Sequence, residues 1–102
     1  MNTANLQLEG LLMAVAALNQ ALVAKGMLAT EEIDRSLAIC EQTVLGDDRV
    51  TEDLSPANRD AILFPIRVLR LANNMAGDTG VPPFAELARR VGETKGAYND
   101  QL

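Results

Sequence analysis

The side chains that most often carry enzyme chemistry are scarce in this sequence. It contains no histidine and a single cysteine, Cys40. Without histidine the chain lacks the usual general base near neutral pH, the imidazole-based triads and the commonest zinc ligand. A single cysteine forms no disulfide within the chain, which suits a reducing cytoplasm. We therefore expect a cytoplasmic protein that is not an enzyme, with no catalytic residues, no metal and no cofactor.

Cys40 is the one candidate nucleophile. A reactive thiol requires an electropositive and partly exposed setting, such as the N-terminus of a helix. Cys40 instead lies late in a predicted helix, at helical spacing from Ile33, Leu37 and Val44. Free cysteine usually behaves as a small buried hydrophobic residue. We therefore expect Cys40 to be buried and structural.

Four carboxylates lie within seven residues of one predicted loop, namely Asp47, Asp48, Glu52 and Asp53. Such a cluster raises the question of a calcium or magnesium site. The loop lacks the alternating ligand spacing and the central glycine of an EF-hand, and Arg49 interrupts it. The sequence therefore predicts a solvated acidic loop and no metal site.

Two arginines, Arg67 and Arg70, lie one helical turn apart, and Asn74 follows one turn later. Together they could bind an anionic ligand or the carboxylates of a partner. The alternative is that the arginines pair with Asp60 or with the acidic loop, as charges on helix surfaces usually do. We expect the pairing, and we keep ligand binding by Arg67, Arg70 and Asn74 as an alternative.

Caps and helix breakers divide the chain into four segments. Gly26 is placed to end the first helix in the left-handed conformation, and Thr30 is the predicted N-cap of the second. Pro56 suits the first turn of the third helix, and Pro65 lies inside it, where we expect a kink. The predicted helices span residues 5–25, 30–45, 56–76 and 83–92. We expect a frayed tail over residues 93–102.

The composition fits these four helices. The chain has 102 residues, of which 48% are hydrophobic and 3% aromatic, so leucine and alanine dominate its apolar content. Leucine and alanine favour helices, whereas strands favour aromatic and β-branched residues. We predict one all-α domain over residues 1–102, a compact four-helix bundle-like fold. The net charge of −5 argues against general binding to polyanions.

The first and third predicted helices are apolar on most sides, and such helices need cover on most sides. The run Leu11–Leu18 is entirely apolar, but Asn19 and Gln20 interrupt it well short of the roughly 20 apolar residues that span a bilayer. We therefore interpret the first helix as a core helix and expect no membrane partner. Four helices in one small monomer give limited cover, which favours a homodimer. The predicted interface residues are Leu11, Val15, Leu18, Leu22, Phe64, Val68, Leu71 and Met75.

The segment 84–98 resembles the core of bacterial helix-turn-helix regulators. In that motif an alanine is followed four residues later by a turn glycine, and Ala88 and Gly92 match these positions. The resemblance implies that a recognition helix follows Gly92 and that Arg89, Arg90 and Lys95 contact phosphates. The sequence departs from the motif after the glycine, where polar residues replace the apolar anchors of a recognition helix. We do not expect nucleic-acid binding.

Taken as a whole, the chain resembles the small uncharacterised all-helical proteins of bacteria, a resemblance that implies no particular activity. Our first hypothesis is a non-enzymatic protein–protein interaction or accessory module that acts as a homodimer and also has a possible second protein partner. Two alternatives stay open. One is a helix-turn-helix DNA-binding regulator, and the other is a small-ligand-binding protein that uses Arg67 and Arg70.

Overall fold

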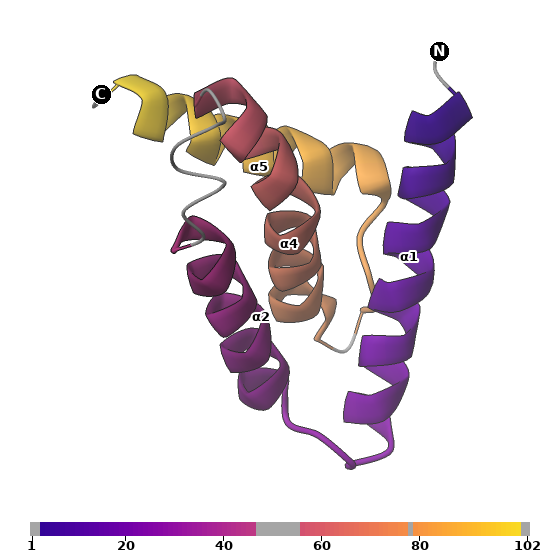
Figure 1. Ribbon diagram of the computed structural model, residues 1–102. Helices are drawn as coiled ribbons and strands as arrows, with labels where there is room; N and C mark the ends of the chain where they lie inside the picture. Colours follow the sequence, from indigo (N-terminus) through magenta and orange to yellow (C-terminus); the bar gives the residue numbers. More distant parts are fainter. Residues whose placement is uncertain (1–2, 47–55, 78, 101–102) are drawn as a thin grey trace.

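The predicted helices are present in a computed structural model, which describes residues 3–46, 56–77 and 79–100 (Figure 1). The described residues form four helices and no strands, so the all-α, bundle-like fold is confirmed. The acidic loop with Asp47, Asp48, Glu52 and Asp53 lies outside the described residues. The helices are α1 (Thr3–Ala24), α2 (Thr30–Leu45), α4 (Pro56–Ala76) and α5 (Phe84–Asp100).

Helix α4 lies at the centre of the molecule. It packs against α1, α2 and α5, and Figure 1 shows α1 and α2 on opposite sides of it while α5 crosses one of its ends. Each outer helix therefore needs one buried stripe, whereas α4 needs several. This arrangement explains why the sequence of α4 is apolar on more than one side.

Gly26 ends the first helix as predicted. Its φ of 76° is the left-handed conformation that glycine adopts without a steric penalty. The backbone N–H of Gly26 donates to the carbonyl of Val23, and that of Met27 donates to the carbonyl of Leu22, both at 3.0 Å. These two bonds form a Schellman motif, which satisfies carbonyls that would otherwise lack helical partners.

The start of α2 differs from the prediction. The N-cap is Ala29, whose side chain cannot accept a hydrogen bond, and Thr30 is the first helical residue. The backbone N–H of Ala29 instead donates to the Glu32 carboxylate at 2.8 Å. Glu32 thus supplies one half of a capping box from the third helical position, which makes a hydroxyl at the N-cap unnecessary.

Pro65 does not divide the third predicted helix. Helix α4 runs without interruption from Pro56 to Ala76 and contains Pro65. Proline has no N–H, so the carbonyl of Ala61 loses its helical donor. Ala61 lies at the exposed surface, where water can satisfy a carbonyl.

The hydrophobic core joins α1, α4 and α5. Ala72 and Leu87 are fully buried, and partly buried side chains surround the core on several sides. Phe64 and Phe84 meet edge to face with ring centroids 6.3 Å apart, a favourable geometry for aromatic pairs. The core cluster consists of Leu12, Ala16, Val68, Ala72, Leu87 and Val91.

The last helix is longer than predicted. We expected it to end near Gly92 with a frayed tail over residues 93–102, but the helical backbone of α5 continues to Asp100. Glycine inside a helix costs about 1 kcal/mol relative to alanine. The ion pair between Arg89 and Glu93 spans Gly92 at 2.7 Å and supports the helix at this point.

Candidate functional site

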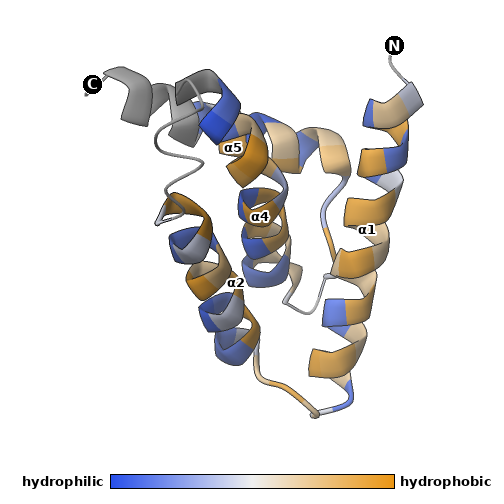
Figure 2. Cartoon of the chain, in the orientation of Figure 1, coloured by the Kyte–Doolittle hydropathy of each residue, from blue (hydrophilic) through white to orange (hydrophobic). Residues whose placement is uncertain are grey.

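The side of α1 that faces away from α4 carries exposed apolar residues. Within α1, Leu12 and Ala16 are buried against the core. Leu11, Ala14, Leu18 and Ala21 are all exposed, Leu11 by 61% and Leu18 by 65%. At 100° per residue these four fall on one stripe roughly opposite the buried pair. We call this stripe the outer α1 face, and Figure 2 shows that α1 is largely hydrophobic.

This exposure corrects the interpretation of the first helix as a core helix. Two of the 22 residues of α1 are buried, so the helix is peripheral. Asn19 and Gln20 do not interrupt it, and by length and composition alone, with a mean hydropathy of 1.4, it is long and apolar enough to cross a membrane. A core helix of a soluble protein and a signal sequence meet the same criteria.

The structure divides the eight predicted interface residues into two groups. Leu11 and Leu18 lie on the outer α1 face, and Val15 and Leu22 beside them are half-buried. Val68 is 1% exposed, so it belongs to the core of a single chain and is not available to a partner. The other residues of α4, Phe64, Leu71 and Met75, are half-buried against the same core. Of the eight predicted interface residues, the two that are exposed in one chain are therefore both on α1.

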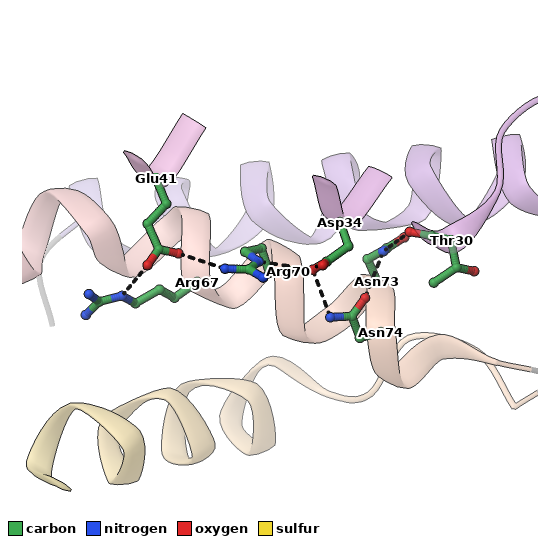
Figure 3. A network of polar contacts seen from close by, with 7 residues as sticks. All are labelled: Thr30, Asp34, Glu41, Arg67, Arg70, Asn73 and Asn74. Atoms are coloured by element: carbon green, nitrogen blue, oxygen red, sulfur yellow. Dashed lines mark hydrogen bonds and ion pairs between the residues drawn. The ribbon is translucent and has the colours of Figure 1, made fainter. Parts of the chain in front are cut away.

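A polar cluster links α2 to α4 (Figure 3). The Arg70 guanidinium donates from Nε to Asp34 Oδ1 at 3.0 Å and from Nη2 to Asp34 Oδ2 at 3.3 Å. Its Nη1 also donates to Glu41 Oε1 at 3.3 Å. The bidentate contact fixes the orientation of Arg70 as well as its charge. These contacts between side chains hold the two helices in one rotational setting.

The ionisation of this pair reflects the same contacts. Hydrogen bonds from Arg70, then from Asn74 Nδ2 at 3.0 Å, hold the pKa of Asp34 below its usual value of 3.8, against a smaller opposing effect of burial. The hydrogen bond to Asp34 correspondingly raises the pKa of Arg70. Both residues are therefore charged near neutral pH, and the pair is a stabilising contact.

Arg67 extends the cluster along α4. Its Nε lies 3.6 Å from Glu41 Oε2, and its Nη1 lies 3.7 Å from Asp60 Oδ1. The predicted pairing of these arginines with Asp60 is thus confirmed for Arg67. Three carboxylates face two guanidinium groups, so the cluster has a formal charge of −1. An anionic ligand at Arg67, Arg70 and Asn74 would have to compete with these carboxylates.

An open cleft lies beside the cluster, where Leu71 and Val91 add apolar walls. Its volume of about 420 Å³ is within the range of small-molecule sites. Arg90 and Glu93 also line it, and both already take part in ion pairs along α5. The cleft therefore has room for a ligand, but the charged side chains that line it already form ion pairs with other side chains of the protein.

Asn73, next to Asn74 in the sequence, is a buried polar residue. The residue is 8% exposed, and its Nδ2 donates to the carbonyl of Thr30 at 3.0 Å and to Asn74 Oδ1 at 3.1 Å. It ties the start of α2 to the last turns of α4.

A second cleft, of about 520 Å³, lies next to Asn73 between α1 and α4 and is lined largely by small side chains such as Ala16 and Ala76.

Cys40 is exposed, so the expectation that it is buried is wrong. The reason is the rotational setting of α2. The inward side of α2 is wide: it contains the buried Ile33, the half-buried Leu37 and Val44, and the acids Asp34 and Glu41, which bind Arg70 of α4. Cys40 lies just beyond the Ile33 edge of this side and is therefore exposed.

The residues of the helix-turn-helix resemblance lie along one continuous helix. Gly92, the expected turn residue, is inside α5. Arg89 is paired with Glu93 at 2.7 Å and Arg90 with Glu86 at 3.2 Å, whereas Lys95 lies beyond the side chains that the structure describes.

Within the described part of the chain, no group of three or more acidic or cysteine residues is placed to hold a metal ion.

The Asp34–Arg70 pair leads to a prediction about acid. Because the pKa of Asp34 is lowered in the folded state, the contribution of its charge to stability is present above the ordinary pKa of 3.8 and is lost as pH falls through the lower, folded pKa. Asp34→Asn should therefore lower the free energy of unfolding at pH 7 by roughly 0.5–1 kcal/mol and by less at pH 2. Urea titrations at both pH values measure this, with Glu9→Gln on α1 as the matched change. An equal effect of Asp34→Asn at both pH values would contradict the pairing.

Comparisons with protein-family models, with curated proteins and with solved structures find no match to this chain.

Proposed function

We propose that this protein is a non-enzymatic interaction module that acts as a homodimer through the outer α1 face. The observation that carries the proposal is the exposure of Leu11 and Leu18, at 61% and 65%, on one stripe of a helix that is apolar throughout its middle. A single exposed leucine is ordinary on a soluble protein. A contiguous apolar stripe, with Ala14 between the two leucines and Ala21 beyond Leu18, is instead typical of a contact surface.

The chemistry of α1 favours a protein partner over a charged polymer or an anionic lipid surface. Between Glu9 and Lys25 the sequence has no ionisable side chain. Helices that lie on anionic membranes usually carry lysine and arginine along their polar face, and nucleic-acid surfaces need a similar basic cluster. The outer α1 face offers apolar contact instead, and a second copy of the chain presents the same kind of surface.

The symmetry of a homodimer makes one substitution count twice. Fully burying a leucine side chain is worth about 1.5–3 kcal/mol, and a two-fold dimer would bury both copies of Leu18. Because Leu18 is 65% exposed in one chain, the dimer would bury about two thirds of each leucine. Losing that burial in both copies costs roughly 2 kcal/mol or more. This corresponds to a dissociation constant raised by about 30-fold or more.

Leu18→Glu is therefore the variant that tests the proposal. We expect a concentration-dependent dimer for the unaltered protein and a dissociation constant at least about 30-fold higher for Leu18→Glu, measured by sedimentation equilibrium. Ile39→Glu is the matched control. Ile39 is 60% exposed, similar to Leu18 at 65%, but it belongs to α2 and not to the outer α1 face. This control should dimerise like the unaltered protein.

Circular dichroism of both variants distinguishes lost assembly from lost folding. Both should keep the helical signal of the unaltered protein, since each new charge replaces an exposed side chain. An unaltered protein that stays monomeric at all accessible concentrations would contradict the proposal. So would a Leu18→Glu variant that dimerises as tightly as Ile39→Glu.

The proposal also includes the place of action. Cys40 is a free thiol at the surface, and exposed thiols persist in a reducing compartment. A cytoplasmic homodimer suits this chemistry, because oxidation of Cys40 would link copies through α2 and bypass the outer α1 face.

A further inference from the structure

The outer α1 face alternates large and small side chains, and we infer that two copies pair through α1 in antiparallel orientation. This inference rests on the proposed homodimer. Leu11, Ala14, Leu18 and Ala21 follow one another at spacings of three and four residues, the spacing of a two-helix seam. All four are exposed in one chain, so the seam has no cover within the monomer.

The alternation selects the orientation by volume. In an antiparallel pair, Leu11 lies opposite the partner's Ala21, and Ala14 lies opposite the partner's Leu18. Every layer then holds one large and one small side chain and has nearly the same volume. In a parallel pair, leucine would meet leucine and alanine would meet alanine, so crowded layers would alternate with voids. Protein interiors tolerate neither crowding nor voids well.

The ends of the seam select the same orientation by charge. Gln7 and Lys25 continue the stripe in its two directions, and both are exposed. Lys25 still follows the helical path, since its N–H donates to the carbonyl of Ala21 at 3.0 Å. Antiparallel pairing places Lys25 beside the partner's Gln7, whose amide oxygen can accept a hydrogen bond. Parallel pairing would place two ammonium groups side by side, and it would also align the two helix dipoles unfavourably.

The fold leaves this approach open. Helix α1 forms one side of the molecule and packs on α4 through its opposite face (Figure 1). A second copy can therefore dock along α1 while each chain keeps its own core.

Disulfide cross-linking tests the orientation. Gln7 and Lys25 are 18 residues apart, or about 27 Å along a helix. In a Cys40→Ser background, chains with Gln7→Cys and chains with Lys25→Cys are prepared with tags of different mass, mixed and oxidised. We expect the disulfide between unlike chains and at least about tenfold less between like chains. A third chain with Ile39→Cys, exposed on α2, reports random collision and should link to neither.

The dissociation constant of a packing variant provides a second test, because the antiparallel and parallel arrangements predict changes in opposite directions. Ala14→Leu would crowd the partner's Leu18 in an antiparallel pair and should raise the dissociation constant at least about tenfold. In a parallel pair the same change would fill a void and lower it. Efficient self-linking of the Gln7→Cys chain, or tighter dimerisation of Ala14→Leu, overturns the antiparallel arrangement.

Sedimentation of the unoxidised chains separates the two proposals. If they are monomeric, the homodimer itself fails. If they are dimeric but yield no cross-link above the Ile39→Cys background, the homodimer stands and the α1 seam is wrong.

Discussion

Replacing Val68 with Glu is expected to unfold the protein at neutral pH. Val68 is 1% exposed, near the middle of α4, and it packs in one cluster with Leu12 of α1 and Leu87 of α5. A carboxylate at this position would be buried without a partner, which costs several kcal/mol. Small domains are stable by about 5–15 kcal/mol in total, so this one change removes much or all of that margin. Circular dichroism and urea titration measure the loss.

Two further variants define what this result means. Val68→Ala keeps the site apolar and should cost about 1–3 kcal/mol while leaving the protein folded. Leu18→Glu carries the same new charge on an exposed site and should keep its helical content. A Val68→Glu variant with the melting temperature of the unaltered protein would contradict the burial of Val68 inside one chain.

Val68 also shows where sequence reasoning reaches its limit. The spacing of apolar residues in α4 correctly indicates a helix that needs cover on several sides. It does not indicate whether the cover comes from the same chain or from a second one. In the structure α4 is central and receives its cover from α1, α2 and α5, whereas α1 is peripheral. The same pattern of apolar residues thus has one meaning in α4 and another in α1.

In helix α2, the sequence does not determine which side of the helix faces α4. Its sequence offers an apolar stripe through Ile33 and Cys40 and a second stripe through Asp34 and Glu41. The structure buries part of each stripe: Ile33 is 6% exposed, and Arg70 of α4 binds both acids of the second stripe, whereas Cys40 at the edge of the first is exposed. Arg67, Arg70 and Asn74 were identifiable as a group on one helix. Asp60, on the same helix, was identifiable as a partner of Arg67. The partners on α2, Asp34 and Glu41, were not, because that pairing depends on how two helices separated by a long segment pack together.

The helix ends were predictable where a single residue determines the geometry. Gly26 is an example, since a left-handed residue at this point has a local cause. The start of α2 and the length of α5 depend on longer side chains, Glu32 and the Arg89–Glu93 pair, which compete with the simpler signals of Thr30 and Gly92. Local signals therefore predict that a helix ends more reliably than they predict which residue ends it.

Leu87→Ala is the second change with a large expected effect, because it tests how α5 is held. Leu87 is 0% exposed, and it shares the core cluster with Val68 and Val91. Truncating a buried leucine to alanine typically costs 2–5 kcal/mol, through lost transfer free energy and the cavity that remains. We expect a lower urea midpoint with an unchanged m-value, measured at one protein concentration because a dimer's stability depends on it.

Ala85→Gly provides the comparison for Leu87→Ala. Ala85 is exposed on the same helix, so its replacement weakens α5 by helix propensity alone, at about 1 kcal/mol. If Leu87→Ala costs no more than Ala85→Gly, α5 contributes little to the core. If it costs several times more, α5 is part of the same cooperative unit as α4. Loss of dimerisation in Leu87→Ala would then follow from unfolding, whereas loss in the folded Leu18→Glu variant reports on the outer α1 face itself.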